Sequence, residues 1–207
     1  MSDESAQKHE TPGWASDAQN VALDAVFARH RERLRRMVQL RMDRRLYGRI
    51  DASDVLQDAF VEASQRFERY REAPTMPEFV WLRFLVAERL TTLHRHHLHV
   101  KARDANREVS LWNGPLPAAS SAAIAAQLVG NLTSPSNAAV RAERVLRLQE
   151  ALNAMDPLDR EVLSLRHFEQ LTRRETAQVL NIAESAAGKR YLRALQRLRS
   201  FLADLDV

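Results

Sequence analysis

The feature that most constrains this chain is a run of 32 residues, Val109 to Val140, without a single charged side chain. The run is rich in Ala, Ser and Asn and is interrupted by Gly and Pro, a composition typical of a linker rather than of a domain surface. On both sides of it, charged sequence carries apolar residues at the three- and four-residue steps of a helix. The sequence therefore predicts two small helical domains joined by a flexible uncharged linker. Within that linker, residues 118–132 are apolar enough to form a short docking helix, but too short and too polar to cross a bilayer.

The composition favours an all-α fold and excludes several classes of function. Five glycines in 207 residues are too few for the glycine-punctuated turns of barrels or for phosphate-cradling loops. The absence of cysteine excludes a disulfide framework, a thiolate metal site and a cysteine nucleophile. Without an 18-residue apolar run or a signal-peptide pattern, no membrane insertion and a cytoplasmic location are expected. No hydrolase or nucleotide-binding motif occurs, so no enzymatic activity, no small-molecule substrate and no cofactor is expected.

The linker and the local patterns set the expected domain boundaries. Residues 1–20 are polar and aperiodic and are predicted to form a disordered tail. The first domain is expected at residues 21–108, the linker at 109–140, and the second domain at 141–207. Asp51 is predicted to cap a helix of the first domain, with Asp54 in its first turn.

The C-terminal block carries the pattern of a helix-turn-helix. A capping box, Thr172 to Glu175, precedes a short helix, and Asn181 stands where the turn needs a residue that tolerates the left-handed region. Ser185 is predicted to cap the second helix, at about residues 186–202. This spacing is typical of DNA-reading units whose second helix enters the major groove. Residues 186–199 hold five cations and no acid, whereas an ordinary solvated helix mixes signs. The predicted DNA contacts are Ser185, Ala186, Lys189, Arg190, Arg193 and Arg197.

Three observations leave alternatives open. All but three of the 31 cationic residues are arginine, which suits phosphates and base edges but is equally expected from a high-GC genome. The nine arginines between Arg29 and Arg49 fit either a contact with a partner or an ordinary solvated face. Gly188 within the second helix fits either close approach to DNA or drift.

Two sets of motifs carry a family resemblance. Residues 54–60 (DVLQDAF), 81–90 (WLRFLVAERL) and 94–97 (HRHH) resemble sigma domain 2 of the extracytoplasmic-function (ECF) group within the sigma-70 family of bacterial RNA polymerase sigma factors. Residues 155–163 (MDPLDREVL), together with the helix-turn-helix, resemble sigma domain 4. The two sets occur in the right order and at the right separation.

The resemblance implies a non-enzymatic specificity subunit that directs core RNA polymerase to promoters. Domain 2 would bind the polymerase and open and read the −10 element, and domain 4 would read the −35 element with the six residues named above. The implied polymerase contacts are Asp54, Gln57, Asp58 and Glu62, for which the alternative is an acidic helix start that serves its own dipole. The implied −10 contacts are Arg83, Glu88, Arg89, Thr92, His94, Arg95, His96, Lys101 and Arg103.

This sequence departs from the family pattern at two of these positions, since Glu88 and Thr92 stand where many members have Asn and Asp. Trp81 and Phe84 are expected in the core rather than as platforms for unstacked bases. The four histidines in residues 93–99 lack an i, i+4 pair on one face, so no metal site is expected.

The implied partners are core RNA polymerase and promoter DNA, and relatives often have an anti-sigma factor as well. The linker would thread near the polymerase active-site channel, or dock back on a domain as an internal brake. The competing hypothesis is a stand-alone regulator, which predicts a dimer, a palindromic operator and a ligand cavity.

Overall fold

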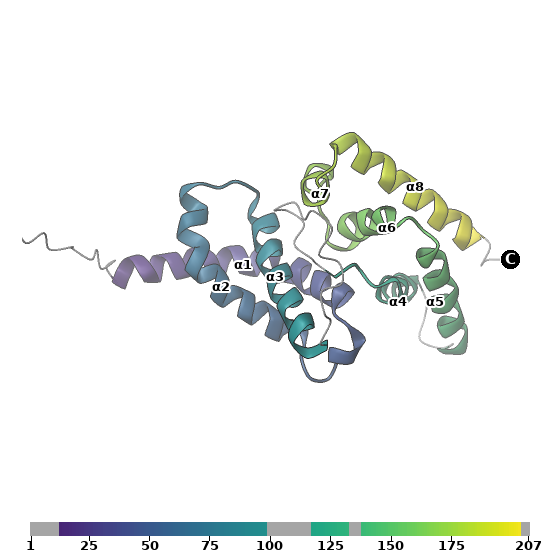
Figure 1. Cartoon of the computed structure of the whole chain (residues 1–207), viewed down its shortest axis with the longest axis horizontal. Coiled ribbons are helices and arrows are strands. Elements are labelled where there is room, and N and C mark those ends of the chain that lie inside the picture. Colours follow the sequence, from purple (N-terminus) through teal and green to yellow (C-terminus); the bar gives the residue numbers. More distant parts are fainter. Residues whose placement is uncertain (1–12, 99–116, 133–137, 204–207) are drawn as a thin grey trace, which may run out of the picture.

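The computed structural model describes residues 13–98, 117–132 and 138–203, and in these ranges every regular element is a helix. The predicted all-α fold is therefore confirmed. Figure 1 shows the helices gathered into an N-terminal group and a C-terminal group that lie against each other. The elements are α1 Gly13–Arg41, the 3₁₀ turn η1 Arg44–Leu46, α2 Ala52–Glu72, α3 Glu78–Leu98, α4 Ser121–Leu132, α5 Ala138–Asn153, α6 Pro157–Leu163, the π-helical turn η2 Ser164–Phe168, α7 Arg173–Leu180 and α8 Glu184–Ala203.

The N-terminal group is a bundle of α1, α2 and α3 around one apolar core. Each helix contributes a stripe of buried side chains at helical spacing, among them Leu34, Val55 and Phe79. Trp81 is also buried and stacks on Tyr70 with 4.5 Å between the ring centroids, as expected of a core residue. The prediction of a disordered tail to residue 20 was wrong for residues 13–20, which belong to α1. Nothing after Gly13 breaks a helix, so the first turns extend although their sequence lacks an apolar period.

The helix starts predicted at Asp51 and Thr172 are confirmed. Asp51 accepts from the backbone N–H groups of Ser53 and Asp54 at 2.5 and 3.1 Å, which begins α2. Asp156 begins α6 in the same way, with Pro157 in the first turn. These caps satisfy N–H groups that the helix itself leaves unpaired.

Part of the predicted linker is a packed helix. The docking helix expected within residues 118–132 is confirmed as α4, whose Ile124, Ala125 and Val129 are buried, mainly against α5. The backbone N–H of Ser120 donates to the carbonyl of Leu40 at 2.8 Å, which ties the start of α4 to the end of α1. Uncharged small residues therefore serve close helix packing here rather than chain flexibility.

The C-terminal group packs α4, α5, α6 and α8 around a second core, and α7 packs against α8. On α8 the buried row consists of Ala187, Ala194 and Leu198, whereas Leu192 is 61% exposed. The spacing of Leu192, Leu195 and Leu198 in the sequence predicts that all three face inward, and for Leu192 this prediction was wrong. Steps of seven and four keep one face of a helix in register, while repeated steps of three drift around it. None of the helices in the described ranges combines the length and hydropathy that a bilayer crossing requires.

Candidate nucleic-acid interface

The helix-turn-helix consists of α7, a three-residue turn and α8. Thr172 accepts from the backbone N–H of Glu175 at 3.1 Å, and Glu175 accepts from that of Thr172 at 2.7 Å, so the predicted capping box is confirmed. Asn181 adopts φ 50°, ψ 48°, the left-handed conformation expected there. The backbone N–H of Ile182 donates to the carbonyl of Ala177 at 3.0 Å and closes the turn. Small buried side chains, Ala177 and those on the facing row of α8, let the two helices pack closely.

The outward face of α8 presents the cations that the sequence predicted there. Lys189, Arg193 and Arg197 are exposed, while Arg190 is half-buried and donates to Asp159 at 2.7 Å. Asp159 is almost fully buried and also lies 3.4 Å from Arg193, so one carboxylate fixes two guanidinium groups. Arginines held in place in advance lose less conformational freedom when they bind DNA.

The start of α8 differs from the prediction. The helix begins at Glu184, so Ser185 lies inside its first turn. The prediction that Ser185 caps the helix was therefore wrong. Ser185 is nevertheless exposed, and Ala186 is half-buried beside it. Both lie at the helix end that enters the groove in DNA-reading units of this kind.

Gly188 faces α7 rather than the outward surface. A Cβ atom built there lies 3.4 Å from Nε of Arg173, an ordinary contact with a flexible side chain. We therefore expect Gly188→Ala to raise the free energy of unfolding by about 1 kcal/mol, measured by urea denaturation. The control is Gly48→Ala, which is expected to destabilise because Gly48 has φ 81°. A loss of stability in Gly188→Ala would contradict this placement.

A second surface lies between α2 and α3, where a groove of about 520 Å³ brings together members of the two predicted domain 2 sets. Asp58 accepts from Nε of Arg89 at 2.8 Å, and Arg66 joins Glu62 at 2.5 Å to Glu88 at 3.1 Å. All of these side chains are partly exposed, so the pairs hold little energy and leave the groups available to a partner. The remaining lining residues are Val61, Leu85 and Thr92.

The other members of the predicted polymerase set have different surroundings. Gln57 is exposed on α2. Asp54 accepts from the backbone N–H of Asp51 at 2.9 Å, so its carboxylate serves the start of its own helix. For Asp54 the structure thus favours the local alternative named above.

Several residues of the predicted −10 set are not displayed outward. Arg83 is buried and donates through Nε to Glu169 at 2.7 Å, so the expectation of an exposed cation is wrong for this arrangement. Nε2 of His94 accepts from the backbone N–H of Asp43 at 3.3 Å, and burial lowers the pKa of His94 despite the nearby Asp43 carboxylate. His94 is therefore neutral at pH 7 and turned inward.

The rest of this set is on the surface or outside the described ranges. Arg95 and His96 are exposed near the end of α3, and Thr92 donates its hydroxyl to the carbonyl of Glu88 at 2.9 Å. Lys101 and Arg103 lie outside the residues that the structure describes.

Sequence reasoning missed the buried ionic group between the two domains, which we call the seam cluster: Arg41, Arg83, Glu161 and Glu169. Arg41 of α1 bonds to both Glu161 and Glu169, and Arg83 of α3 reaches Glu169 at 2.7 Å and Glu161 at 3.9 Å. Burial alone would raise the pKa of Glu169, but the charges and hydrogen bonds of Arg41 and Arg83 outweigh it and lower that pKa. Glu169 is thus ionised in a dry site.

A further arginine of α1 supports the same seam. Arg33 donates to the carbonyls of Glu169 and Gln170 at 2.9 and 3.1 Å, and its guanidinium carbon lies 3.5 Å from the centre of the Phe79 ring. Gln170 has φ 56°, the left-handed region that non-glycine residues rarely adopt. For Arg33 and Arg41, the arginine-rich first helix is therefore explained by contacts within the chain.

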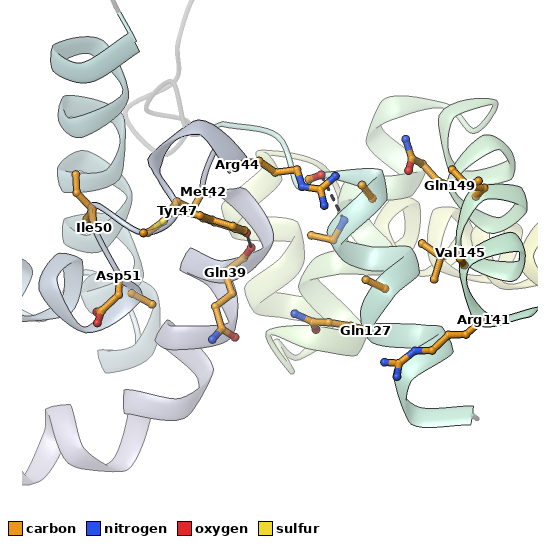
Figure 2. A pocket seen from close by; sticks show the side chains of 18 of the residues that line it. Gln39, Met42, Arg44, Tyr47, Ile50, Asp51, Gln127, Arg141, Val145 and Gln149 are labelled. Atoms are coloured by element: carbon orange, nitrogen blue, oxygen red, sulfur yellow. Dashed lines mark hydrogen bonds between the residues drawn. The ribbon is translucent and has the colours of Figure 1, made fainter. Parts of the chain in front are cut away.

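A groove of about 900 Å³ opens beside the seam, between the end of α1 with η1 and the helices α4 and α5. Figure 2 shows Gln39 and Tyr47 on one side of it and Gln127, Arg141 and Val145 on the other. Half of its lining residues on α4 and α5 are alanines, and both domains contribute walls. The groove therefore exists only while the two domains lie together.

Comparison with known proteins relates one segment to a family and the whole chain to a known fold. Residues 145–198, which include the helix-turn-helix, match the family model described as sigma-70, region 4. The whole fold is similar to that of CnrH, solved in complex with the cytosolic domain of CnrY, with a TM-score of 0.52 and 21% sequence identity over 93% of this chain and 94% of that one. No curated protein matches the chain.

Residues 145–198 are therefore of the sigma-70 region 4 type. The likeness of the whole chain to CnrH shows the fold.

Proposed function

We propose that the protein directs core RNA polymerase to promoters by dividing recognition between its two domains. The C-terminal domain would read the −35 element through the outward face of α8, and the N-terminal domain would open and read the −10 element. The observation that carries this proposal is the set of exposed cations on α8, Lys189, Arg193 and Arg197, with no acid between them. Arg190 and Arg193 are held by Asp159, in the segment that matches sigma-70 region 4. Arginine forks of this kind pair with guanine edges and phosphates in the major groove.

The polymerase contact would lie on the groove between α2 and α3. Asp58 and Glu62 are both paired with arginines of the same domain, so a basic partner surface would exchange these surface pairs for its own. Surface pairs are worth little, and their exchange costs little. The bond-making chemistry would belong to the core enzyme.

Control by a protein partner follows from the likeness to CnrH, which was solved with the cytosolic domain of CnrY. A partner seated in the groove beside the seam would touch both domains at once. It would therefore favour their closed arrangement, because a ligand shifts an equilibrium towards the state that it binds better. The uncharged alanine floor suits an apolar helix, and Arg44 and Arg141 on the walls suit one with acidic flanks.

Arg193→Ala tests the promoter assignment. We expect it to reduce initiation at −35-dependent promoters by about 5- to 150-fold, the equivalent of losing one base-reading arginine. The measurement is run-off transcription with core polymerase. The matched control is Arg199→Ala, since Arg199 is also exposed on α8 but lies about 22 Å along the helix from Glu184 at 1.5 Å per residue.

Equal activity of Arg193→Ala and the wild type would place DNA on another face of α8. Failure of the wild-type protein to co-elute with core polymerase, with the free protein running as a dimer, would reject the sigma assignment in favour of a stand-alone regulator.

A further inference from the structure

The two domains contribute opposite charges to the seam cluster. Both arginines of the seam cluster come from the N-terminal domain, and both carboxylates come from the C-terminal domain. Separation of the domains would therefore leave two cations on one surface and two anions on the other. Each of the four side chains pairs only with cluster members of the other domain. The charges of the cluster are therefore balanced only when the two domains lie together.

Apolar contacts surround this cluster and cross the same boundary. Leu165, Leu171 and Val179 of the C-terminal domain belong to the buried cluster of the N-terminal bundle, and Leu40 of α1 belongs to the buried cluster of the other domain. These contacts exclude water from the charges. In a dry site an ionised group without its partner is strongly disfavoured.

We propose that the seam cluster is a latch that holds the free protein closed, and that it opens when the protein engages its partners. The latch rests on the geometry alone, whereas its release on core polymerase rests on the proposed function. In the closed arrangement Arg83, a predicted DNA contact, is buried. Glu161 and Glu169 are paired with its guanidinium group, which phosphates would otherwise bind. The closed state and contact of Arg83 with DNA exclude each other.

The hydrogen bonding of the seam cluster is incomplete, which favours its opening. Among the described residues, Nε of Arg41 and Nη2 of Arg83 have no hydrogen-bond partner although both are buried. Incomplete hydrogen bonding leaves part of the desolvation cost unrecovered, so water and a partner's phosphates or carboxylates compete well for these groups. Glu169 also follows the π-helical turn η2 and precedes the left-handed Gln170, so the segment that presents it is already under strain.

The absence of cysteine from the sequence permits a direct test. Gln65→Cys on α2 and Gln196→Cys on α8 place donor and acceptor dyes on exposed positions of the two domains. Single-molecule energy transfer on the full chain then reports the ratio of closed to open molecules. The variants are Glu169→Gln and, as a matched control, Glu143→Gln, an exposed carboxylate that pairs with Arg147 of the same helix, α5.

We expect Glu169→Gln to lower the ratio of closed to open molecules at least tenfold, because it leaves two buried arginines with one carboxylate. Glu143→Gln should leave the ratio unchanged. Addition of Arg83→Met to Glu169→Gln restores one cation to one anion and should bring the ratio back to within about threefold of the wild type. Far-UV circular dichroism confirms that each variant keeps its helices. If Glu169→Gln is too unstable to measure, Glu161→Gln, whose carboxylate is partly exposed, replaces it with an expected shift of about threefold.

An unchanged ratio in the glutamine variant, an equal shift in Glu143→Gln, or no recovery in the double variant would overturn the latch. Addition of core polymerase to the wild type should shift it to the open form. If Glu169→Gln opens the protein while polymerase neither binds nor shifts the wild type, the latch stands and the proposed function fails. Polymerase binding without any effect of Glu169→Gln rejects the latch alone.

Discussion

Asp58→Arg is expected to reduce the affinity for core RNA polymerase at least tenfold, about 1.4 kcal/mol, without unfolding the protein. Asp58 is partly exposed on α2, and its only ionic partner among the described residues is Arg89, at 2.6 Å. A reversed charge would meet a basic partner surface with repulsion, while the loss of a surface pair costs the fold only about 0.2–1 kcal/mol. The measurement is a binding titration with labelled core polymerase, and urea denaturation checks stability.

Two variants sharpen this prediction. Glu68→Arg reverses another exposed carboxylate of α2, which lies 3.9 Å from Arg71 outside the groove, and should leave the affinity unchanged. Arg89→Ala removes the partner of Asp58 but keeps the carboxylate, so the affinity should stay the same or rise. If Asp58→Arg binds as tightly as the wild type, the polymerase does not use this groove.

Phe79→Ala is expected to lower the free energy of unfolding by about 3–5 kcal/mol. Phe79 is fully buried in the N-terminal core, and its ring carries the guanidinium of Arg33 at 3.5 Å. The substitution leaves a cavity and also releases Arg33, which holds the segment around Glu169. Since small domains have only about 5–15 kcal/mol in total, the loss should be plain as a fall in the urea midpoint.

The control for this variant is Val61→Ala, an exposed apolar residue of α2. Its effect should stay within about 0.5 kcal/mol, because no core contact is lost. A change in Phe79→Ala no larger than that in Val61→Ala would mean that the α1–α3 packing described above is incorrect.

Features of the sequence that act locally could be predicted. Helix starts can be predicted at Asp51, Asp156 and Thr172, because a capping side chain and the N–H groups that it satisfies lie within three residues of each other. The turn at Asn181 is local in the same sense. The order of helix, turn and helix was also predicted correctly, and Lys189, Arg193 and Arg197 are exposed on α8 as expected.

What the sequence could not show depends on contacts between distant residues. Arg83 and Glu169 are 86 positions apart, and nothing near either residue indicates that the two will be buried together. For this reason Arg83 was assigned to a DNA surface. The row on α8 was misread because Leu192 has the more apolar side chain, whereas packing against the rest of the domain selected the small Ala194.

The arginine-rich first helix shows the same limit. Composition alone cannot separate a surface arginine from one that bridges two domains, as Arg41 does. The uncharged segment was compatible with two structures, a flexible tether and a packed helix. Its residues 121–132 fold as α4, and only the packing of Ile124 and its neighbours distinguishes that helix from a tether.

The exchange of hydrophobic residues across the seam has a consequence for how such a chain can be recombined. Leu40 completes the core of the other domain, and Leu165 and Leu171 complete the core of the first. A hybrid gene that joins this N-terminal half to the C-terminal half of a related protein would encode two domains whose apolar surfaces do not fit each other. Swaps that respect this architecture would have to transfer the end of α1 together with the segment from α6 to α7. The two domains would therefore have to be exchanged as a pair. The uncharged linker predicted from the sequence does not separate two independently packed units.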